Sequence, residues 1–451
     1  MTASISLTVS QFKRNWTKLI SEDFVRELCT QLGYNWRRRI LDPGKTVQLF
    51  LLQVLHGNVA LSCVPHLASS RFTASALCQA RQKIPLEVFD ALLEAVSCLI
   101  EQEEFSNSDW HGHRVLIVDG SGFSMPDTEE LQQHFPQSKN QQPGCGFPTA
   151  KFTALLHYDT GMISRVSLGS LKSHDMNHTA QIETALQPND IELGDRAFCS
   201  FAHYALLLRG QKHAVMRAHQ TRIIRFQSCP GAPRSRSKGY RQAPSGEWME
   251  QLGNKDQLVR WYKPYARPKW MNQEEYDALP DFIVVRELEF EIIEKGFRTQ
   301  KVTIVTTLLD HEKYPKEQIA KLYRKRWQIE VNFRHLKTTM KMDILHSKTY
   351  NGICKELIMF CLIYNLVWLV VRCAAEAKKR NPQEISFIDA LRWLQHSADS
   401  ATIHAIVVVK YRPNRFEPRE VKRRSKPFKW LTKSRAARRE ELMNPITCAL
   451  T

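Results

Sequence analysis

The sequence predicts a mixed α/β fold, in which a helical N-terminal region precedes a core of strands and helices. Three observations carry this prediction. Apolar residues recur at helical spacing over residues 1–110, strands and helices alternate over residues 111–216, and a long helix begins at Pro315. Residues 217–300 form a β-rich stretch that separates the two parts of the core.

The composition favours a polyanionic partner. The chain has 451 residues, of which 24% are charged and 43% hydrophobic, which excludes wholesale disorder and a multi-span membrane protein. Lys and Arg number 64 against 46 Asp and Glu, a net charge of +18. Nucleic acid is the usual partner of such a chain, although charge alone also leaves ribosome-associated and membrane-surface proteins open.

Cysteine usage and hydropathy predict a cytoplasmic protein that does not enter a membrane. The 11 cysteines are scattered and include no Cys-x-x-Cys pair, which fits a reducing cytosol and argues against a structural zinc site. The first residues contain no apolar run of the kind found in secretory signals. The longest apolar run, residues 357–371, is interrupted by Asn365 and is shorter than the roughly 20 residues of a membrane span. We therefore expect a buried helix there.

The N-terminal region is predicted to consist of helices that include residues 46–61 and 86–101. The segment between them has polar side chains that resemble the reading face of a helix-turn-helix, and a plain helical bundle explains the same pattern equally well. These side chains are Arg71, Gln79, Arg81, Gln82 and Lys83. Residues 37–39 add a small basic cluster.

The core is predicted to open with antiparallel strands. A strand over residues 114–119 is expected to run into a glycine-rich turn, so that Asp119 ends the strand. A hairpin follows, with its turn at residues 159–161, and then a short strand that ends at Asp195. A helix and two further strands complete the pattern before the helix at Pro315.

The C-terminal region is strongly basic. Residues 410–441 contain 13 Lys and Arg but only four Asp and Glu, together with three prolines. Proline and charge predict an extended or partly disordered segment. It could be a solvated tail, but the total charge favours contact with a phosphate backbone.

Three carboxylates are candidates for chemistry. Asp119 and Asp195 are expected at strand ends, and Glu330 lies within the long helix. Carboxylates in such an arrangement can hold two Mg²⁺ ions, which activate a water or hydroxyl and stabilise the leaving oxygen in phosphodiester chemistry. Taken singly, each acid could equally be a turn residue or a helix cap.

The long helix carries a polar row beside an apolar one. At about 100° per residue, Tyr323, Arg326, Glu330 and Lys337 project within about 60° of one another. Such a row could be a solvent-exposed face with an Arg326–Glu330 pair. A core-facing side is nevertheless available next to it, formed by Ile319, Leu322, Ile329, Phe333 and Leu336.

These motifs resemble one family. The segment YRKRWQIEVNFRHLK matches the Y-x₂-R-x₃-E-x₆-K signature of DDE transposases in the insertion sequence 4 family. The segments DGSGFSMPDT and GDRAFCSF look like the two earlier acidic motifs of that family. The basic C-terminal region and the segment RRRILDPGKTVQLFLLQVLHGN are also similar, so the resemblance covers nearly the whole chain.

The resemblance implies an α/β, RNase H-like catalytic core that is interrupted by the β-rich insertion. Asp119, Asp195 and Glu330 would be the catalytic and metal-binding triad, with two Mg²⁺ ions for which Mn²⁺ can substitute. The residues that contact DNA would be Tyr323, Arg326 and Lys337. Trp327 lies near the same face and could stack on a displaced base, or else pack in the core. The five regions are 1–110 (helical, DNA-binding), 111–216 (first part of the core), 217–300 (insertion), 301–375 (second part of the core) and 376–451 (C-terminal helical segment and basic tail).

The implied function is metal-dependent cleavage and strand transfer of DNA at transposon ends, by a cut-and-paste route through a hairpin. The partners would be the terminal inverted repeats, the target DNA and a second copy of the chain, in the bacterial cytoplasm and associated with the nucleoid. Two alternatives stay open. One is a structure-selective nuclease on the same fold, and the other is a non-catalytic DNA-binding protein derived from a transposase.

Overall fold

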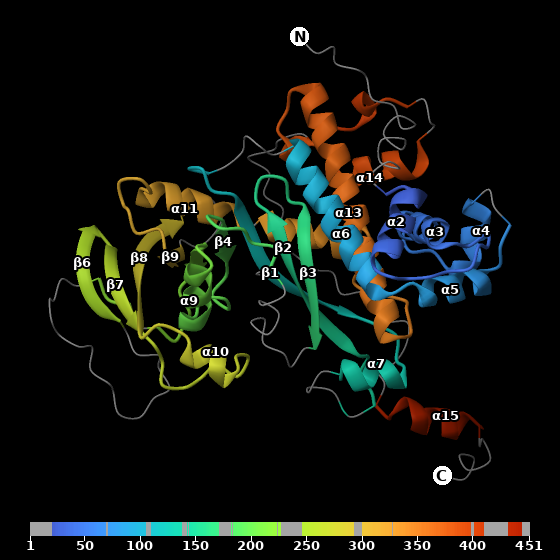
Figure 1. Cartoon of the computed structure of the whole chain (residues 1–451), viewed down its shortest axis with the longest axis horizontal. Helices are drawn as coiled ribbons and strands as arrows, with labels where there is room; N and C mark the ends of the chain where they lie inside the picture. The colour runs from blue at the N-terminus through green and yellow to red at the C-terminus, as the bar shows by residue number, and fades with distance from the viewer. Residues whose placement is uncertain are drawn as a thin grey trace.

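A single mixed sheet forms the centre of the molecule (Figure 1). The computed structural model describes residues 20–68, 71–104, 110–137, 142, 144–170, 182, 184–222, 224–226, 246–292, 300–326, 328–397, 401–409 and 432–443. Within these residues the sheet has nine strands in the order β3-β2-β1-β4-β5-β9-β8-β7-β6. The strands are β1 (Val115–Ser124), β2 (Thr149–His157), β3 (Ile163–Ser170), β4 (Ile191–Gly194), β5 (His213–Arg217), β6 (Glu247–Gly253), β7 (Asp256–Tyr262), β8 (Phe282–Ile292) and β9 (Gln300–Thr306).

Helices flank the sheet and build the N-terminal region. Those before β1 are α2 (Glu22–Gln31), α3 (Pro43–Leu55), η1 (Leu61–Cys63), α4 (Val64–Leu67), α5 (Ala74–Lys83) and α6 (Leu86–Glu104). Those between strands are α7 (Glu129–His134), α9 (Phe201–Arg209) and α10 (Gln273–Asp277). Those after β9 are α11 (Lys316–Lys325), α12 (Gln328–Arg334), η3 (His335–Thr339), α13 (Tyr350–Lys378), η4 (Pro382–Glu384), α14 (Phe387–His396), η5 (Ile403–Ala405) and α15 (Arg435–Met443). The mixed α/β class predicted from the sequence is confirmed.

The first part of the sheet has the predicted antiparallel opening. β1 pairs antiparallel with β2, and β2 with β3, whereas β1, β4 and β5 run parallel. The predicted hairpin turn lies between β2 and β3, where Gly161 has a φ of +68° that side chains rarely adopt. The parallel strands bring their carboxyl ends to one edge, where ligand sites of such sheets form.

The β-rich stretch belongs to the same sheet. β9 pairs with β5 on one side and with β8 on the other, and β7 and β6 continue outward. A buried ion pair joins β8 to the start of β7, with Arg286 Nε donating to Asp256 Oδ1 at 2.7 Å. The predicted strands are therefore present, and they extend the core sheet. The domain boundaries given above stay a prediction.

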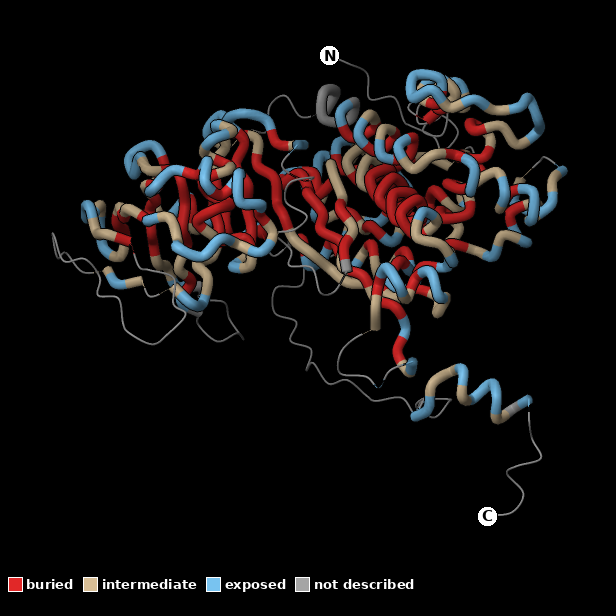
Figure 2. The backbone as a smooth tube through the Cα atoms, turned by 60° about the horizontal axis from the view of Figure 1, so that its bottom comes forward, coloured by how far each residue is buried: buried red, intermediate tan, exposed pale blue. Residues whose placement is uncertain are grey.

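The sheet separates two apolar clusters. One contains Val115 and Ile117 of β1 and is covered by α6 and α13, with α3 packed on α13, while the other contains Leu116 and Val118 and is covered by α9. Because side chains alternate along a strand, successive residues of β1 serve opposite faces. Figure 2 shows burial concentrated in the strands and in the helices packed on them.

The long apolar helix is a core element, as predicted. α13 is apolar enough over its length to cross a membrane, yet 78% of its most apolar window is buried inside the protein. Asn365, the polar residue within this apolar helix, is hydrogen-bonded to β3. Its amide donates to the Ile163 carbonyl and accepts from the Ile163 N–H, each at 2.8 Å. A polar side chain inside the helix thus fixes the start of β3.

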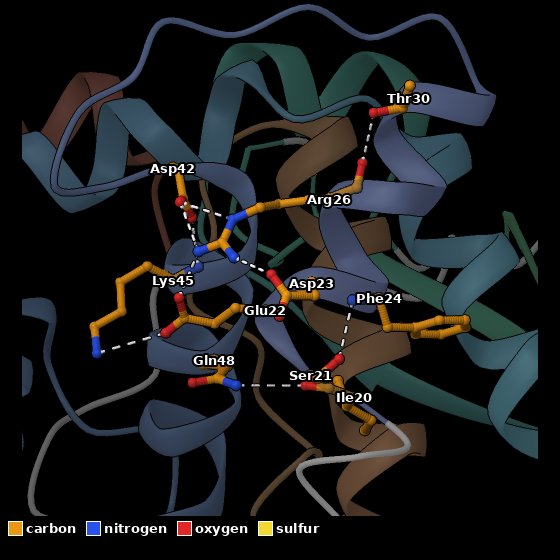
Figure 3. Close-up of polar contacts among 10 residues, drawn as sticks. All are labelled: Ile20, Ser21, Glu22, Asp23, Phe24, Arg26, Thr30, Asp42, Lys45 and Gln48. Carbon is orange, nitrogen blue, oxygen red and sulfur yellow. Dashed lines mark hydrogen bonds and ion pairs between the residues drawn. The ribbon is translucent and has the colours of Figure 1, made fainter.

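The N-terminal helices α2 and α3 meet closely at their first turns (Figure 3). Arg26 lies 2.6 Å from Glu22, 2.6 Å from Asp23 and 2.8 Å from Asp42, the last of which caps α3. A Cβ added at Gly44 would lie 2.5 Å from the Glu22 carbonyl oxygen, so only glycine permits this approach.

Two predicted boundaries are wrong. β1 does not turn after Asp119, because β2 pairs with it from Leu116 through Ser124, so Asp119 lies inside the strand. Gly120 and Gly122 are therefore strand residues, which pair with Thr153 and Lys151 of β2. The end of β1 is also held from outside the sheet, since Ser124 donates to the Asp343 carbonyl and accepts from Leu345.

The long helix expected from Pro315 is broken. α11 ends at Lys325 and α12 begins at Gln328. At the break, the Arg326 N–H bonds to the Tyr323 carbonyl and the Ile329 N–H to the Arg326 carbonyl, the three-residue spacing of a tighter 3₁₀ turn. A turn of about 120° per residue shifts every later side chain relative to a regular helix. Periodicity alone could not predict that shift.

The basic C-terminal segment lies largely outside the described residues, which resume at residue 432. There α15 contacts the loop after β1, with Arg435 2.9 Å from Asp127 and over the Phe147 ring.

Candidate active site

Asp119 and Asp195 stand at the same level of adjacent parallel strands. The register pairs Val115 with Ile191 and Ile117 with Leu193, so position 119 aligns with position 195 just after β4 ends. Both acids continue the face that carries Ile117 and Leu193. The two carboxylates predicted to lie close together are therefore brought side by side by strand pairing.

Backbone groups hold the two carboxylates in place. Asp119 Oδ1 accepts the Gly120 N–H at 2.8 Å, and Asp195 Oδ1 accepts the Ala197 N–H at 2.7 Å. These bonds use one oxygen of each group. The second oxygen of Asp119 lies 3.2 Å from Arg326 Nη1.

The end of α11 lies beside Asp119 and Asp195. Tyr323 and Arg326 are both buried, at 2% and 8% exposure. A charged side chain is rarely buried unless it is paired, and Asp119 is the partner of Arg326. Burial raises the pKa of Tyr323, Arg326 lowers it, and Asp195 raises it further. Burial alone would lower the pKa of Arg326, but Tyr323, Asp119 and Asp195 together hold this pKa above its usual value. All four groups therefore share one electrostatic neighbourhood.

Lys337 reaches the same edge from a different element. It lies in the π-helical segment η3, and its Nζ donates to Ser121 Oγ at 3.2 Å. Ser121 is two residues beyond Asp119 and on the same face of β1. Wide π turns recur at functional sites, where they redirect a side chain.

The structure describes Glu330 but not Trp327. Glu330 is exposed on α12, while the predicted apolar side of the same helices is buried as expected. Among the described residues no three or more His, Cys, Asp or Glu side chains are grouped so that they could hold a metal ion. The assignment of the triad therefore stays a prediction, and Trp327 lies outside the described residues.

Sequence reasoning missed Arg217. β4 and β5 pair Gly194 with Met216, so Arg217 aligns with Asp195 as Asp195 aligns with Asp119. Its charge lowers the pKa of Tyr323, which places it near the cluster. The sequence did contain a signal for Arg217. It is the last residue of the strand HAVMR, just as Asp195 comes at the end of the strand IELGD.

A family model described as the transposase DDE domain matches residues 110–366, which include every residue discussed above. This chain belongs to the transposase DDE domain family. The resemblance found in the three motifs is thereby confirmed at the level of the family, and the activity is that of a DDE transposase, an endonuclease and polynucleotidyl transferase. DDE transposases act on DNA and use divalent metal ions.

Two transposases of insertion sequences are similar over most of their length. The transposase InsG for insertion sequence element IS4 of Escherichia coli (strain K12) is 24% identical, over 79% of this chain and 78% of its own. The transposase for insertion sequence element IS231F of Bacillus thuringiensis subsp. israelensis is 22% identical, over 83% and 81%. They agree with membership of the insertion sequence 4 family. Among solved structures, a piggyBac transposase synaptic complex with hairpin DNA matches with a TM-score of 0.38 and 10% identity, over 84% and 77%.

Proposed function

We propose that this transposase cuts and joins DNA strands at transposon ends through Asp119, Asp195 and Glu330. The single observation that supports this most strongly is the register that sets Asp119 beside Asp195 at the carboxyl edge of the parallel strands. Two carboxylates at one level, with Arg326 and Lys337 beside them, suit a reaction at a phosphodiester. The same geometry supports an RNase H-like description of the core.

The cationic side chains bind the phosphates that flank the bond to be cut. Arg326 presents a planar fork that can bind a phosphate through two parallel hydrogen bonds, and Lys337 supplies a compact charge. Tyr323 packs its ring 5.6 Å from the Arg326 guanidinium carbon, which restricts the fork to few orientations. Trp327 remains a candidate for stacking on a base beside these groups.

The metal we propose is Mg²⁺, as two ions, with Mn²⁺ able to substitute. Carboxylate oxygens are the ligands that Mg²⁺ takes in proteins, and Asp119 and Asp195 offer two of them. In this arrangement Arg326 pairs with Asp119, so a metal ion that binds Asp119 would compete with the Arg326 guanidinium.

The partners are the terminal inverted repeats and target DNA. Joining two ends requires at least a dimer, and the hairpin route is what the resemblance to insertion sequence 4 transposases implies. The net charge of +18 supports a polyanionic partner, and a bacterial cytoplasmic location beside the nucleoid follows from this function. The family match favours this function over a structure-selective nuclease and over a non-catalytic DNA-binding protein.

The test is a cleavage assay on the DNA that flanks this gene, with Mg²⁺ or Mn²⁺ added. Asp119→Asn, Asp195→Asn and Glu330→Gln should each abolish nicking or hairpin formation at a defined end while binding of DNA persists. Asp277→Asn, which changes an exposed acid on α10, is the matched control and should cut normally. Normal cleavage by any of the three variants would remove that residue from the triad.

A further inference from the structure

A second cationic site lies at the carboxyl end of β5. It is a pocket of about 260 Å³ whose lining includes Arg196, Arg217, His219, Arg222 and Lys301. These residues come from three places in the chain: the turn after β4, the end of β5 with the segment that follows it, and the start of β9. Only Arg196 lies within a sequence motif, GDRAFCSF, and no role was assigned to it there.

The pocket concentrates positive charge with little compensation. Among the described residues that line it, none is a carboxylate. Lys301 lies 3.9 Å from Glu291, and both side chains are exposed, so this contact is weak. Arg222 lies over the Trp261 ring at 3.3 Å, and burial lowers its pKa, although the nearby charge of Glu287 acts in the opposite direction. Like charges held together in this way repel one another unless an anion lies between them.

The pocket adjoins the two proposed catalytic acids. Arg196 directly follows Asp195 in the chain, and Arg217 aligns with Asp195 across the β4–β5 pairing. Arg217 also acts on Tyr323, which packs against the acids. An anion bound here would therefore lie next to the phosphodiester that the acids address.

We propose that this pocket binds a backbone phosphate of the DNA strand beside the bond that is cut. The inference rests on the proposed function, because that function places DNA at the acids. The pocket is lined by cationic and polar side chains, which suit a phosphate group. The guanidinium groups of Arg196 and Arg217 match the geometry of phosphate oxygens, so the contact would position the strand and would not read its bases.

The first measurement is DNA affinity as a function of salt, without metal, so that binding is separated from cleavage. The probe is a duplex with one end of the element and its flanking DNA, and the protein is the full chain. Arg196→Gln combined with Lys301→Gln removes two exposed charges and should lower the salt slope by about 1 to 2, because each lost phosphate contact contributes about 0.9. Arg209→Gln with Lys269→Gln removes the same charge from exposed sites elsewhere and is the matched control.

The second measurement locates the contact on the DNA. Single phosphates near the cleavage site are replaced by neutral methylphosphonates. One or two adjacent replacements should weaken binding by the wild type. The same replacements should weaken binding by the double variant less, because the variant keeps Arg217 but has lost Arg196 and Lys301. Melting curves establish that both double variants are folded, which is expected because the substituted side chains are exposed.

Three results would overturn the proposal. The first is a salt slope of the Arg196→Gln, Lys301→Gln variant that equals the slope of the control variant. The second is that each methylphosphonate lowers the DNA affinity of the wild type and of the variant by the same amount. The third is stabilisation of the wild type but not the variant by inorganic phosphate, with an unchanged DNA salt slope, which would assign the pocket to a free phosphate. Failure of the wild type to bind end DNA at all would instead contradict the proposed function.

Discussion

The guanidinium of Arg326 lies 3.2 Å from a carboxylate oxygen of Asp119, at the edge of the sheet where the proposed chemistry takes place. Arg326 is 8% exposed, so the pair is shielded from solvent and its charges interact more strongly than at a surface. A cation therefore already occupies one side of the carboxylate that we assign to a metal. The predictions below begin with this contact.

Arg326→Gln should free Asp119 for a divalent cation. We expect Mn²⁺ to bind more tightly in the absence of DNA, on the order of tenfold or about 1.4 kcal/mol, because the competing charge is removed. The measurement is titration calorimetry with Mn²⁺ alone. Arg324→Gln changes an exposed neighbour on α11 and should leave the affinity as it is. Equal affinities in all three proteins would mean that the ion pair does not compete with metal.

Lys337→Ala should weaken binding to end DNA and lower its salt slope by about 0.9, the effect of one lost phosphate contact. Ser121→Ala removes the hydroxyl that Lys337 contacts at 3.2 Å but no charge, so it serves as the control. We expect the slope to change in the first variant and to be retained in the second. An unchanged slope in Lys337→Ala would place this lysine away from the DNA.

Gly44→Ala should destabilise the N-terminal helices. The added Cβ would lie 2.5 Å from the Glu22 carbonyl oxygen, and backbone cannot move aside as a flexible side chain can. A loss of about 1–3 kcal/mol in the free energy of unfolding is expected, as for other overpacked sites. The Cβ of Gly210→Ala would lie 3.2 Å from the flexible end of Lys212 and 3.5 Å from the Leu207 carbonyl oxygen, so urea unfolding should show a much smaller loss for that variant.

Lys355 should make stability depend on pH in the alkaline range. It is 4% exposed and donates to the Arg81 and Gln82 carbonyls at the end of α5. Burial and the nearby Arg81 lower its pKa from 10.5 to about 8. Between these values the unfolded chain binds more protons than the folded one, so stability rises with pH. The cost of the buried charge is complete below pH 8 and is lost as the pH approaches 10.5.

The variant Lys355→Met has no ionisable group at this position. The difference in stability between the wild type and this variant therefore reports the ionisation of Lys355 alone, although other groups ionise in the same pH range. Urea unfolding of both proteins, below pH 8 and near pH 10.5, should show the wild type gaining stability relative to the variant as the pH rises. A constant difference between the two proteins would show that the pKa of Lys355 is not lowered by folding.

Local pattern alone determined most of the elements. The apolar run at 357–371 predicted the buried helix α13, and the turn at residues 159–161 predicted the β2–β3 hairpin. Both are encoded by periodicity and turn chemistry within a short stretch, which is why no distant contact was needed to find them. The acidic motifs likewise identified Asp119 and Asp195 and, through the family, the kind of reaction.

Only the tertiary structure decided how these residues meet. The register across β1, β4 and β5 aligns Asp119, Asp195 and Arg217, and parallel strands owe their register to contacts far apart in the chain. Arg326 lies buried against Asp119 at the end of α11, whereas Glu330 is exposed on α12, and periodicity did not predict the end of one helix and the start of the next between them. Residue identity and spacing thus determine which groups can react, whereas long-range pairing and a local departure from helical geometry determine which of them are in contact.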